Sequence, residues 1–144
     1  MQLRDILTND IQHLSPDDTI DAARIHLIAS SHSALPVIQA DGTYLGEISE
    51  DDILRVAFAR TESDLNGVST DQIKFLLAKK SSPVSSILRS HSLTVLPTDS
   101  VHEVARTFLQ TDNRILPVLE NGKLIGVVTA ITLLQHYDEV ADLK

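Results

Sequence analysis

Cysteine is absent from the sequence, and aromatic residues make up only 3% of it. Without cysteine the protein can form no disulfide, no thiolate metal site and no cysteine nucleophile. No run of about 18 apolar residues occurs, so no membrane-spanning helix is expected. Residues 1–10 carry charges where a secretory signal peptide needs an apolar stretch, and the sequence therefore predicts a cytoplasmic location.

Motifs of catalysis and metal binding are missing as well. The sequence has no Gly-x-Ser-x-Gly elbow, no phosphate loop ending in Gly-Lys-Ser/Thr and no Gly-x-Gly-x-x-Gly. None of its 6 histidines has a second histidine four positions away, and no zinc-type spacing occurs. We therefore expect no catalytic residue, no metal site and no required cofactor, and the protein is not expected to be an enzyme.

Positive charge is also scarce. The formal net charge is −8, and most of the acidic excess lies in residues 1–60. A protein that binds duplex nucleic acid needs a basic stripe that displaces counterions from phosphates, and no such stripe is present. Nucleic acid and anionic membranes are therefore not expected partners. A small anion can still be held where a few basic groups and backbone N–H groups converge.

The sequence contains an internal repeat, which is typical of proteins built from two similar units. Leu-Pro-Val-Ile at residues 35–38 returns 81 positions later as Leu-Pro-Val-Leu at residues 116–119. Further matches join residues 3–7 to 84–88 and 14–20 to 95–101 at the same offset and, after the loss of one residue, 42–46 to 122–126 at an offset of 80.

The repeat predicts two domains. Residues 1–60 form the first copy, residues 84–144 form the second, and residues 61–83 link them. Within the link, residues 70–80 have the apolar spacing of an extra helix, whose role the sequence does not indicate. Because a unit of about 55 residues buries a small fraction of its surface, we expect the two copies to share one core.

Each copy has the same predicted order of elements. Apolar residues over 101–109 recur at helical spacing, and Ser100 with Glu103 has the spacing of a capping box at the helix start. Residues 20–28 repeat this stripe in the first copy. A short strand is expected before each of these helices.

Two strands and a second helix are expected to follow. Residues 35–38 and 116–119 are short apolar runs typical of buried strands, and the dipeptides Asp-Gly and Asn-Gly after them predict hairpin turns. Last helices are expected at about 50–60 and 130–141. The prediction is an α+β protein with two pseudo-symmetric β-α-β-β-α repeats packed through their sheets.

The junction before the last helix of the first copy is the candidate site. A strand ends there, Ser49 opens a helix, and Asp52 follows three residues later. One interpretation is structural, because serine at the N-cap and an acid at the third helical position stabilise any helix. The other is functional: a carboxylate can accept both hydroxyls of a ribose, while helix N–H groups and the serine hydroxyl face a phosphate.

These combined features resemble the cystathionine-β-synthase (CBS) domain family. The resemblance rests on two copies, Leu-Pro-Val opening the middle strand, and Gly-h-h-Ser/Thr-x-x-Asp (h, apolar) before the last helix, over about residues 3–60 and 84–140. It implies a paired Bateman module whose clefts bind AMP, ADP, ATP or S-adenosylmethionine. It also implies that Asp52 holds the ribose diol, whereas the second copy keeps Thr129 but has Thr132 in place of the aspartate.

The resemblance implies further ligand contacts just before the middle strands and near the first strand. Two interpretations stay open for one of them, Arg114, which is either a phosphate or adenine-edge partner or a solvated surface residue. Arg55 likewise either reaches a phosphate or pairs with Asp52 along the helix. The complete set of predicted binding residues is Ser33, Ala34, Ser49, Asp52, Ser90, His91, Arg114, Ile115, Thr129 and Thr132.

Two hypotheses of function follow. The first is a non-catalytic regulatory module that binds an adenosyl ligand in the cleft between the repeats and signals to a separate, unidentified protein. The alternative is a ligand-free interaction or scaffold protein with degenerate clefts, which Thr132 favours. The apolar character of residues 53–59 exceeds what one sheet can cover, and the family resemblance implies a homodimer formed through such helices.

Overall fold

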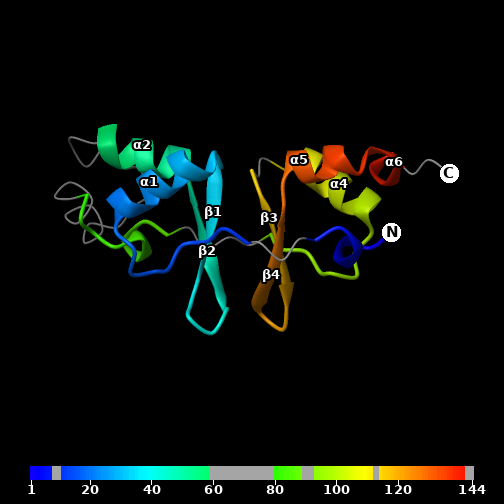
Figure 1. Ribbon diagram of the computed structural model, residues 1–144, viewed down its shortest axis with the longest axis horizontal. Coiled ribbons are helices and arrows are strands. Elements are labelled where there is room, and N and C mark those ends of the chain that lie inside the picture. Colours follow the sequence, from blue (N-terminus) through cyan, green and yellow to red (C-terminus); the bar gives the residue numbers. More distant parts are fainter. Residues whose placement is uncertain (8–10, 59–79, 89–92, 112–113, 142–144) are drawn as a thin grey trace. The chain divides into compact units, whose positions relative to one another are not determined.

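The computed structural model describes residues 1–7, 11–58, 80–88, 93–111 and 114–141 (Figure 1). Of the helix expected at 70–80, residues 70–79 lie outside these residues, and Lys80 lies in a turn. The chain forms two compact units. Unit 1 contains Met1–Ile11, Asp41–Tyr44 and His91–Lys144, and unit 2 contains Gln12–Ala40 and Leu45–Ser90.

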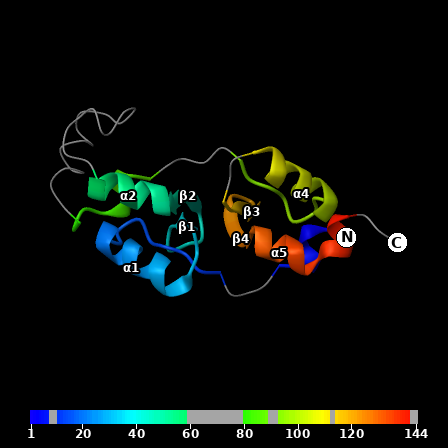
Figure 2. The ribbon, with the colours of Figure 1, turned by 90° about the horizontal axis from the view of Figure 1, so that it is seen from above.

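Unit 2 is built from two helices and a two-stranded sheet. Its elements are α1 (Ile20–Ser30), β1 (Ala34–Ile38), β2 (Tyr44–Ser49), α2 (Glu50–Phe58) and the short 3-10 helix η3 (Val84–Ser86). Figure 2 shows α1 and α2 side by side. The Thr19 hydroxyl accepts a hydrogen bond from Ala22 N (3.0 Å) and so caps α1, which ends at Ser31 in the left-handed conformation (φ 57°).

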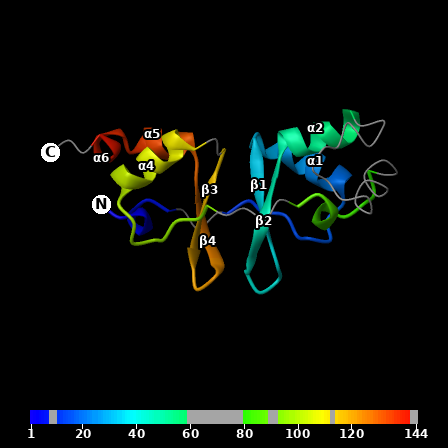
Figure 3. The same cartoon turned by 180° about the vertical axis from the view of Figure 1, so that it is seen from behind.

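Unit 1 repeats this arrangement. Its elements are η1 (Leu3–Asp5), α4 (Val101–Gln110), β3 (Leu116–Glu120), β4 (Lys123–Val128), α5 (Ala130–Gln135) and α6 (Tyr137–Val140). Strands β3 and β4 are antiparallel, and Figure 3 shows the three longer helices on one side of this hairpin. The Ser100 hydroxyl accepts from Glu103 N (3.4 Å), as the predicted cap requires.

The first strand of each repeat is reduced to a single bridging residue. Leu14 N donates to Pro36 O (2.8 Å), and Ile38 N donates to Leu14 O (3.0 Å), so Leu14 forms a parallel bridge to Val37. Val95 has the corresponding bridge in unit 1. The prediction of an α+β fold with two similar repeats is confirmed, although each expected first strand has contracted to this bridge.

The predicted helix at 130–141 is interrupted. The backbone of His136 leaves the helical region (φ −119°, ψ 46°), which divides the segment into α5 and α6. The carbonyl of Val140 accepts a hydrogen bond from His102 Nδ1 (2.6 Å), and this contact joins α6 to α4. This hydrogen bond occurs together with the break at His136, which the helical periodicity of residues 130–141 did not predict.

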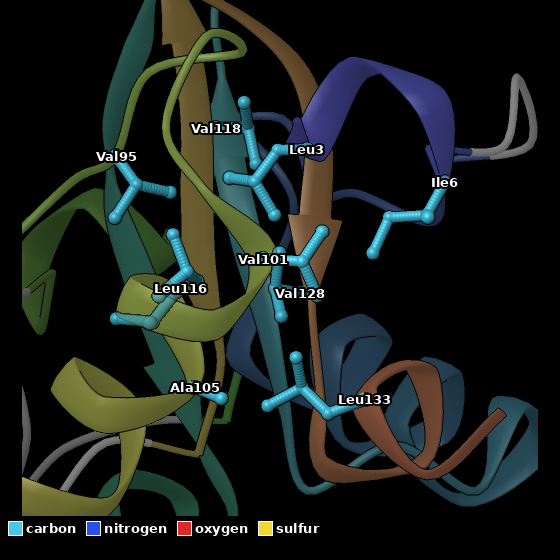
Figure 4. Close-up of a cluster of buried hydrophobic side chains, with 10 residues drawn as sticks. Leu3, Ile6, Val95, Val101, Ala105, Leu116, Val118, Val128 and Leu133 are labelled. Atoms are coloured by element: carbon cyan, nitrogen blue, oxygen red, sulfur yellow. The ribbon is translucent and has the colours of Figure 1, made fainter. Parts of the chain in front are cut away.

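Each hydrophobic core is completed by the opening segment of the other sequence repeat. Leu3 is fully buried in unit 1, and Val84 is fully buried in unit 2. Figure 4 shows Leu3 and Ile6 among side chains from β3, β4 and α4. The compact units therefore differ in composition from the repeats, and the boundaries 1–60 and 84–144 stay a prediction. The two cores consist of Leu14, Ile20, Ala23, Leu27, Leu35, Val37, Ile48, Ile53 and Val84 in unit 2, and Leu3, Ile6, Val95, Val101, Val104, Ala105, Leu116, Val118, Val128 and Leu133 in unit 1.

The buried position of Leu3 generates the first prediction. Leu3→Ala is expected to lower the free energy of unfolding by about 2–5 kcal/mol, because it removes buried methyl groups and leaves a cavity. Leu109→Ala is the matched control, since Leu109 is exposed, and it should change stability by less than about 0.5 kcal/mol. Urea unfolding followed by circular dichroism measures both. Equal effects of the two substitutions would contradict the burial of the opening segment.

A close approach at Gly126 generates the second prediction. A Cβ atom at this position would lie 2.7 Å from Leu7 Cδ2 and 3.2 Å from Leu7 Cγ, so the whole Leu7 side chain would have to move. Gly126→Ala is therefore expected to destabilise the protein by about 1–3 kcal/mol, as measured by thermal or urea unfolding.

The background Leu7→Ala supplies the control for this clash. With the Leu7 methyl groups removed, the alanine at position 126 meets no close atom of that side chain, so the added cost of Gly126→Ala should largely disappear. A double-mutant cycle measures this coupling. Strictly additive effects would show that Leu7 is not the obstacle.

Candidate functional site

The junction of β2 and α2 places Ser49 and Asp52 together. Ile48 is buried in the core of unit 2, and Ser49 is the last residue of the strand. Asp52 Oδ2 accepts hydrogen bonds from Ser49 N (2.8 Å) and from the Ser49 hydroxyl (3.0 Å). Asp52 N lies 3.3 Å from Ser49 Oγ, to which it donates. This reciprocal capping box fixes both side chains at the helix start.

Asp52 is a buried acid, with only 6% of its surface exposed. Its second oxygen, Oδ1, lies 3.6 Å from Arg55 Nη1, so the two residues form an ion pair one turn apart on α2. This contact supports the structural interpretation of Arg55. The partial positive charge of the helix N-terminus also stabilises the carboxylate, which lies in the first turn of α2.

Ser33 joins this junction through its backbone. The carbonyl of Ser33 accepts a hydrogen bond from Glu50 N (2.9 Å), the first residue of α2. Ala34 begins β1 directly after it and is buried. The structure thus brings four predicted residues, Ser33, Ala34, Ser49 and Asp52, into one region of unit 2.

Unit 1 contains the same geometry with different chemistry. Thr129 is the N-cap of α5, and its hydroxyl accepts from Thr132 N (3.3 Å). The Thr132 hydroxyl lies 3.1 Å from Thr129 Oγ1 and accepts from Thr129 N (3.5 Å). Thr132 therefore preserves the capping box but has no carboxylate, so this junction lacks the second acceptor oxygen and the negative charge that an aspartate would supply.

None of the remaining predicted residues that the structure describes lies in unit 2 with the Ser49–Asp52 junction. Arg114 is exposed and precedes β3, whereas Ile115 is buried. Both belong to unit 1, and Ser49 and Asp52 belong to unit 2. Ser90 and His91 lie outside the described residues.

Glu47 is a buried acid that the sequence analysis did not select. Only 8% of its surface is exposed, and it lies in β2 two residues before Ser49. Residues two apart in a strand lie on the same face, so Glu47 shares a face of β2 with Ser49. The repeat could have indicated that Glu47 is buried, because the equivalent position in the second copy, 80 residues later, holds the apolar Val127.

The described residues contain neither a metal-binding cluster nor a membrane-spanning helix. Among the described residues, no group of three or more histidine, cysteine, aspartate or glutamate side chains could hold a metal ion. No helix in the part of the chain that the structure describes is long and apolar enough to cross a membrane.

The chain is similar in sequence to a CBS domain-containing protein and to an uncharacterized protein. It is 34% identical over 134 residues to a CBS domain-containing protein of Dictyostelium discoideum, covering 92% of this chain and 88% of that protein. It is 26% identical over 139 residues to an uncharacterized protein of Methanocaldococcus jannaschii, covering 96% of this chain but 32% of that protein. The chain thus spans about a third of that archaeal relative.

Solved structures share the fold. The crystal structure of CBSX2 in complex with AMP superimposes with a TM-score of 0.77 at 24% sequence identity, covering 97% of this chain and 98% of that chain. CBSX2 is a CBS-pair protein from Arabidopsis thaliana. The CBS domain family model matches residues 3–59 and 84–139. Since these two matches account for most of the sequence and each contains one capping-box junction, the chain belongs to the CBS domain family and carries two CBS repeats.

Proposed function

We propose that the protein is a non-catalytic regulatory module that binds an adenine nucleotide or a related adenosyl ligand. The observation that carries this proposal is the buried Asp52 carboxylate, held by Ser49 at the start of α2. In this proposal the two repeats are paired through their sheets, and the ligand lies in the cleft between them. The AMP complex of the structurally similar CBSX2 supports the choice of ligand class.

Asp52 has the chemistry needed to bind a ribose. A carboxylate accepts hydrogen bonds on both oxygens, and Ser49 orients the group through Oδ2. Oδ1 forms the ion pair with Arg55 Nη1 at 3.6 Å. A ribose diol at Oδ1 would add hydrogen bonds to a charged acceptor, which are stronger than those between neutral groups.

The remaining predicted residues complete the proposed site. Ser33 and Ala34 border the start of α2, while Arg114, Ile115, Ser90 and His91 would contact the ligand from the second repeat. Arg114 supplies a positive charge for a phosphate. Thr129 and Thr132 form the weaker site, because uncharged hydroxyls make weaker hydrogen bonds to a ribose than the two oxygens of a carboxylate.

Regulation requires that the ligand bind two states of the module with different affinity, since equal affinity shifts no equilibrium. The proposed output is a change in the arrangement of the repeats or of two protomers, detected by a separate protein. A cytoplasmic location belongs to the same proposal.

A ligand-free scaffold is the second candidate function. The observation that favours it is Thr132, which retains the capping box of α5 without the acid. The Ser49–Asp52 box can likewise serve only to cap α2. The two candidates differ in whether the protein binds an adenosyl ligand at all, and titration calorimetry with AMP, ADP, ATP and S-adenosylmethionine distinguishes them.

Asp52→Ala tests the role of the carboxylate. If Asp52 holds a ribose, the dissociation constant should rise about 10- to 150-fold, because a charged hydrogen-bonding group contributes roughly 1.5–3 kcal/mol. Calorimetry with the tightest ligand of the panel measures the change. Thr132→Ala is the matched control, since it alters the equivalent capping position without removing a charge, and it should leave this affinity within about twofold.

Melting of the same variants separates binding from capping. Loss of a cap costs about 0.5–2 kcal/mol of stability whether or not a ligand binds. An Asp52→Ala protein with a lower melting temperature but unchanged affinity would leave Asp52 as a helix cap alone. Absence of binding to the wild-type protein across the whole panel would favour the scaffold.

We also propose a homodimer formed through the helices. Leu54 on α2 and Leu134 on α5 occupy equivalent positions in the two repeats, and both are exposed. Burying such side chains between protomers would contribute about 1.5–3 kcal/mol each. Light scattering at micromolar concentration should therefore give twice the chain mass of 15.8 kDa.

The variant Leu54→Asp/Leu134→Asp supplies the control for this dimer. Charges at these exposed positions should not disturb either core but should oppose burial between protomers, so the mass should fall to that of one chain. A wild-type protein that is monomeric at all accessible concentrations would contradict the proposed dimer.

A further inference from the structure

Residues 1–7 form an arm that binds unit 1 through its backbone. Leu3 N donates to Asp99 O (2.9 Å), and Arg4 N donates to Pro97 O (2.9 Å). In return Val101 N, at the start of α4, donates to Met1 O (3.0 Å). These bonds make Gln2 and Ser100 an antiparallel bridge. We call residues 1–7 the first arm and residues 96–101 its acceptor segment.

Residues 82–88, the second arm, bind unit 2 in the same register. Val84 N donates to Asp18 O (2.8 Å), Ser85 N donates to Pro16 O (3.2 Å), and Ile20 N donates to Ser82 O (2.9 Å). Each donor and acceptor lies 81 positions from its counterpart in the other unit. One backbone pattern therefore occurs twice, and each time the arm and its acceptor segment come from different sequence repeats.

The side chains of the two arms follow one apolar pattern. Leu3, Ile6 and Leu7 of the first arm correspond to Val84, Ile87 and Leu88 of the second. Each set packs against the core of its unit, and Leu3 and Val84 are fully buried. Each arm contains a short 3-10 helix, and its acceptor segment holds it in the same backbone register and with the same apolar side-chain spacing.

We propose that the acceptor segment of unit 1 binds the first arm of a second copy of this chain, so that two chains associate by exchanging residues 1–7. The first arm of a second chain has the backbone register and the apolar side chains that the acceptor segment binds. A second copy of this chain is therefore the proposed partner. The exchanged dimer keeps the hydrogen bonds and apolar contacts between the arm and unit 1, but the arm then belongs to the other chain of the pair. This is the condition under which exchange of an identical element costs little free energy.

The chain concentration determines which of two forms predominates: the closed form, in which the arm binds its own chain, or the exchanged form. A short connection holds the arm at an effective concentration of about millimolar next to its own acceptor segment. The closed form therefore predominates at micromolar chain concentration, and exchange becomes substantial as the chain approaches about 1 mM. This association differs from the helix-mediated dimer, and it does not rest on the proposed function.

Disulfide trapping tests the exchange, because the natural sequence has no cysteine to interfere. Gln2 and Ser100 form a bridge in which the flanking residues exchange the hydrogen bonds, and Cα atoms of such pairs lie about 4.5 Å apart. That separation suits a disulfide. The experiment mixes a Gln2→Cys chain with a Ser100→Cys chain, unfolds and refolds them together, and oxidises the mixture.

A covalent heterodimer is expected on non-reducing electrophoresis. Because random pairing makes only half of the exchanged dimers mixed, its yield should rise from about one per cent or less at about 10 µM total chain to roughly a quarter at about 1 mM. Gln2→Cys mixed with Gln110→Cys is the control for random collision, since Gln110 lies at the opposite end of α4 from Ser100. The helix-mediated dimer cannot produce the 2–100 product, because each arm then stays on its own chain. A yield equal to that control at every concentration would overturn the proposal.

One chain carrying both Gln2→Cys and Ser100→Cys checks the register and the fold. At about 10 µM it should form an intramolecular disulfide and remain a monomer on the gel. Its far-ultraviolet circular dichroism should match that of the wild type. Failure of this folded variant to form the disulfide would show that the arm does not occupy the acceptor segment, and would also overturn the proposal.

Discussion

Burial of Leu3 in unit 1 and of Val84 in unit 2 is the interaction on which the two cores depend. Each residue belongs to a short arm that enters the core of the unit built mainly from the other repeat. Full burial of such a side chain contributes about 1.5–3 kcal/mol, a considerable share of the stability of a small domain. Because each arm is covalently joined to the other repeat, neither core can be completed by its own repeat alone.

The cores in turn hold the capping boxes in place. Ile48 is buried beside Leu14 and Val84 in the core of unit 2, and the strand containing it ends at Ser49. The direction in which Ser49 and Asp52 face therefore depends on how the adjacent Ile48 packs in the core. Val128 has the same role before Thr129 in unit 1. The two junctions share a backbone solution and differ in one functional group, the carboxylate at position 52.

Asp52 and Thr132 meet the same structural requirement, the capping of a helix, but they differ in charge. Both side chains accept the backbone N–H of the cap residue, so either residue satisfies the helix start. Only the aspartate adds a buried negative charge, and a buried charge has to be compensated by hydrogen bonds or by an opposite charge. Ser49 and Arg55 provide that compensation in unit 2. Both junctions therefore satisfy the start of a helix, and they differ in the charge that unit 2 has to compensate.

The sequence by itself determined the repeat, the helices and hairpins of each copy, and the pairing of Ser49 with Asp52, because periodicity, turn dipeptides and capping act over a few residues. Only the tertiary structure decided that the arms cross between the repeats, that His136 breaks the last helix, and that Glu47 is buried. The position of the arms depends on contacts between residues far apart in the chain, such as Leu3 with Asp99, and the break at His136 occurs together with the hydrogen bond between His102 and Val140. Local sequence patterns do not indicate which distant segment completes a core. That contact is determined by the free energy of burying apolar surface.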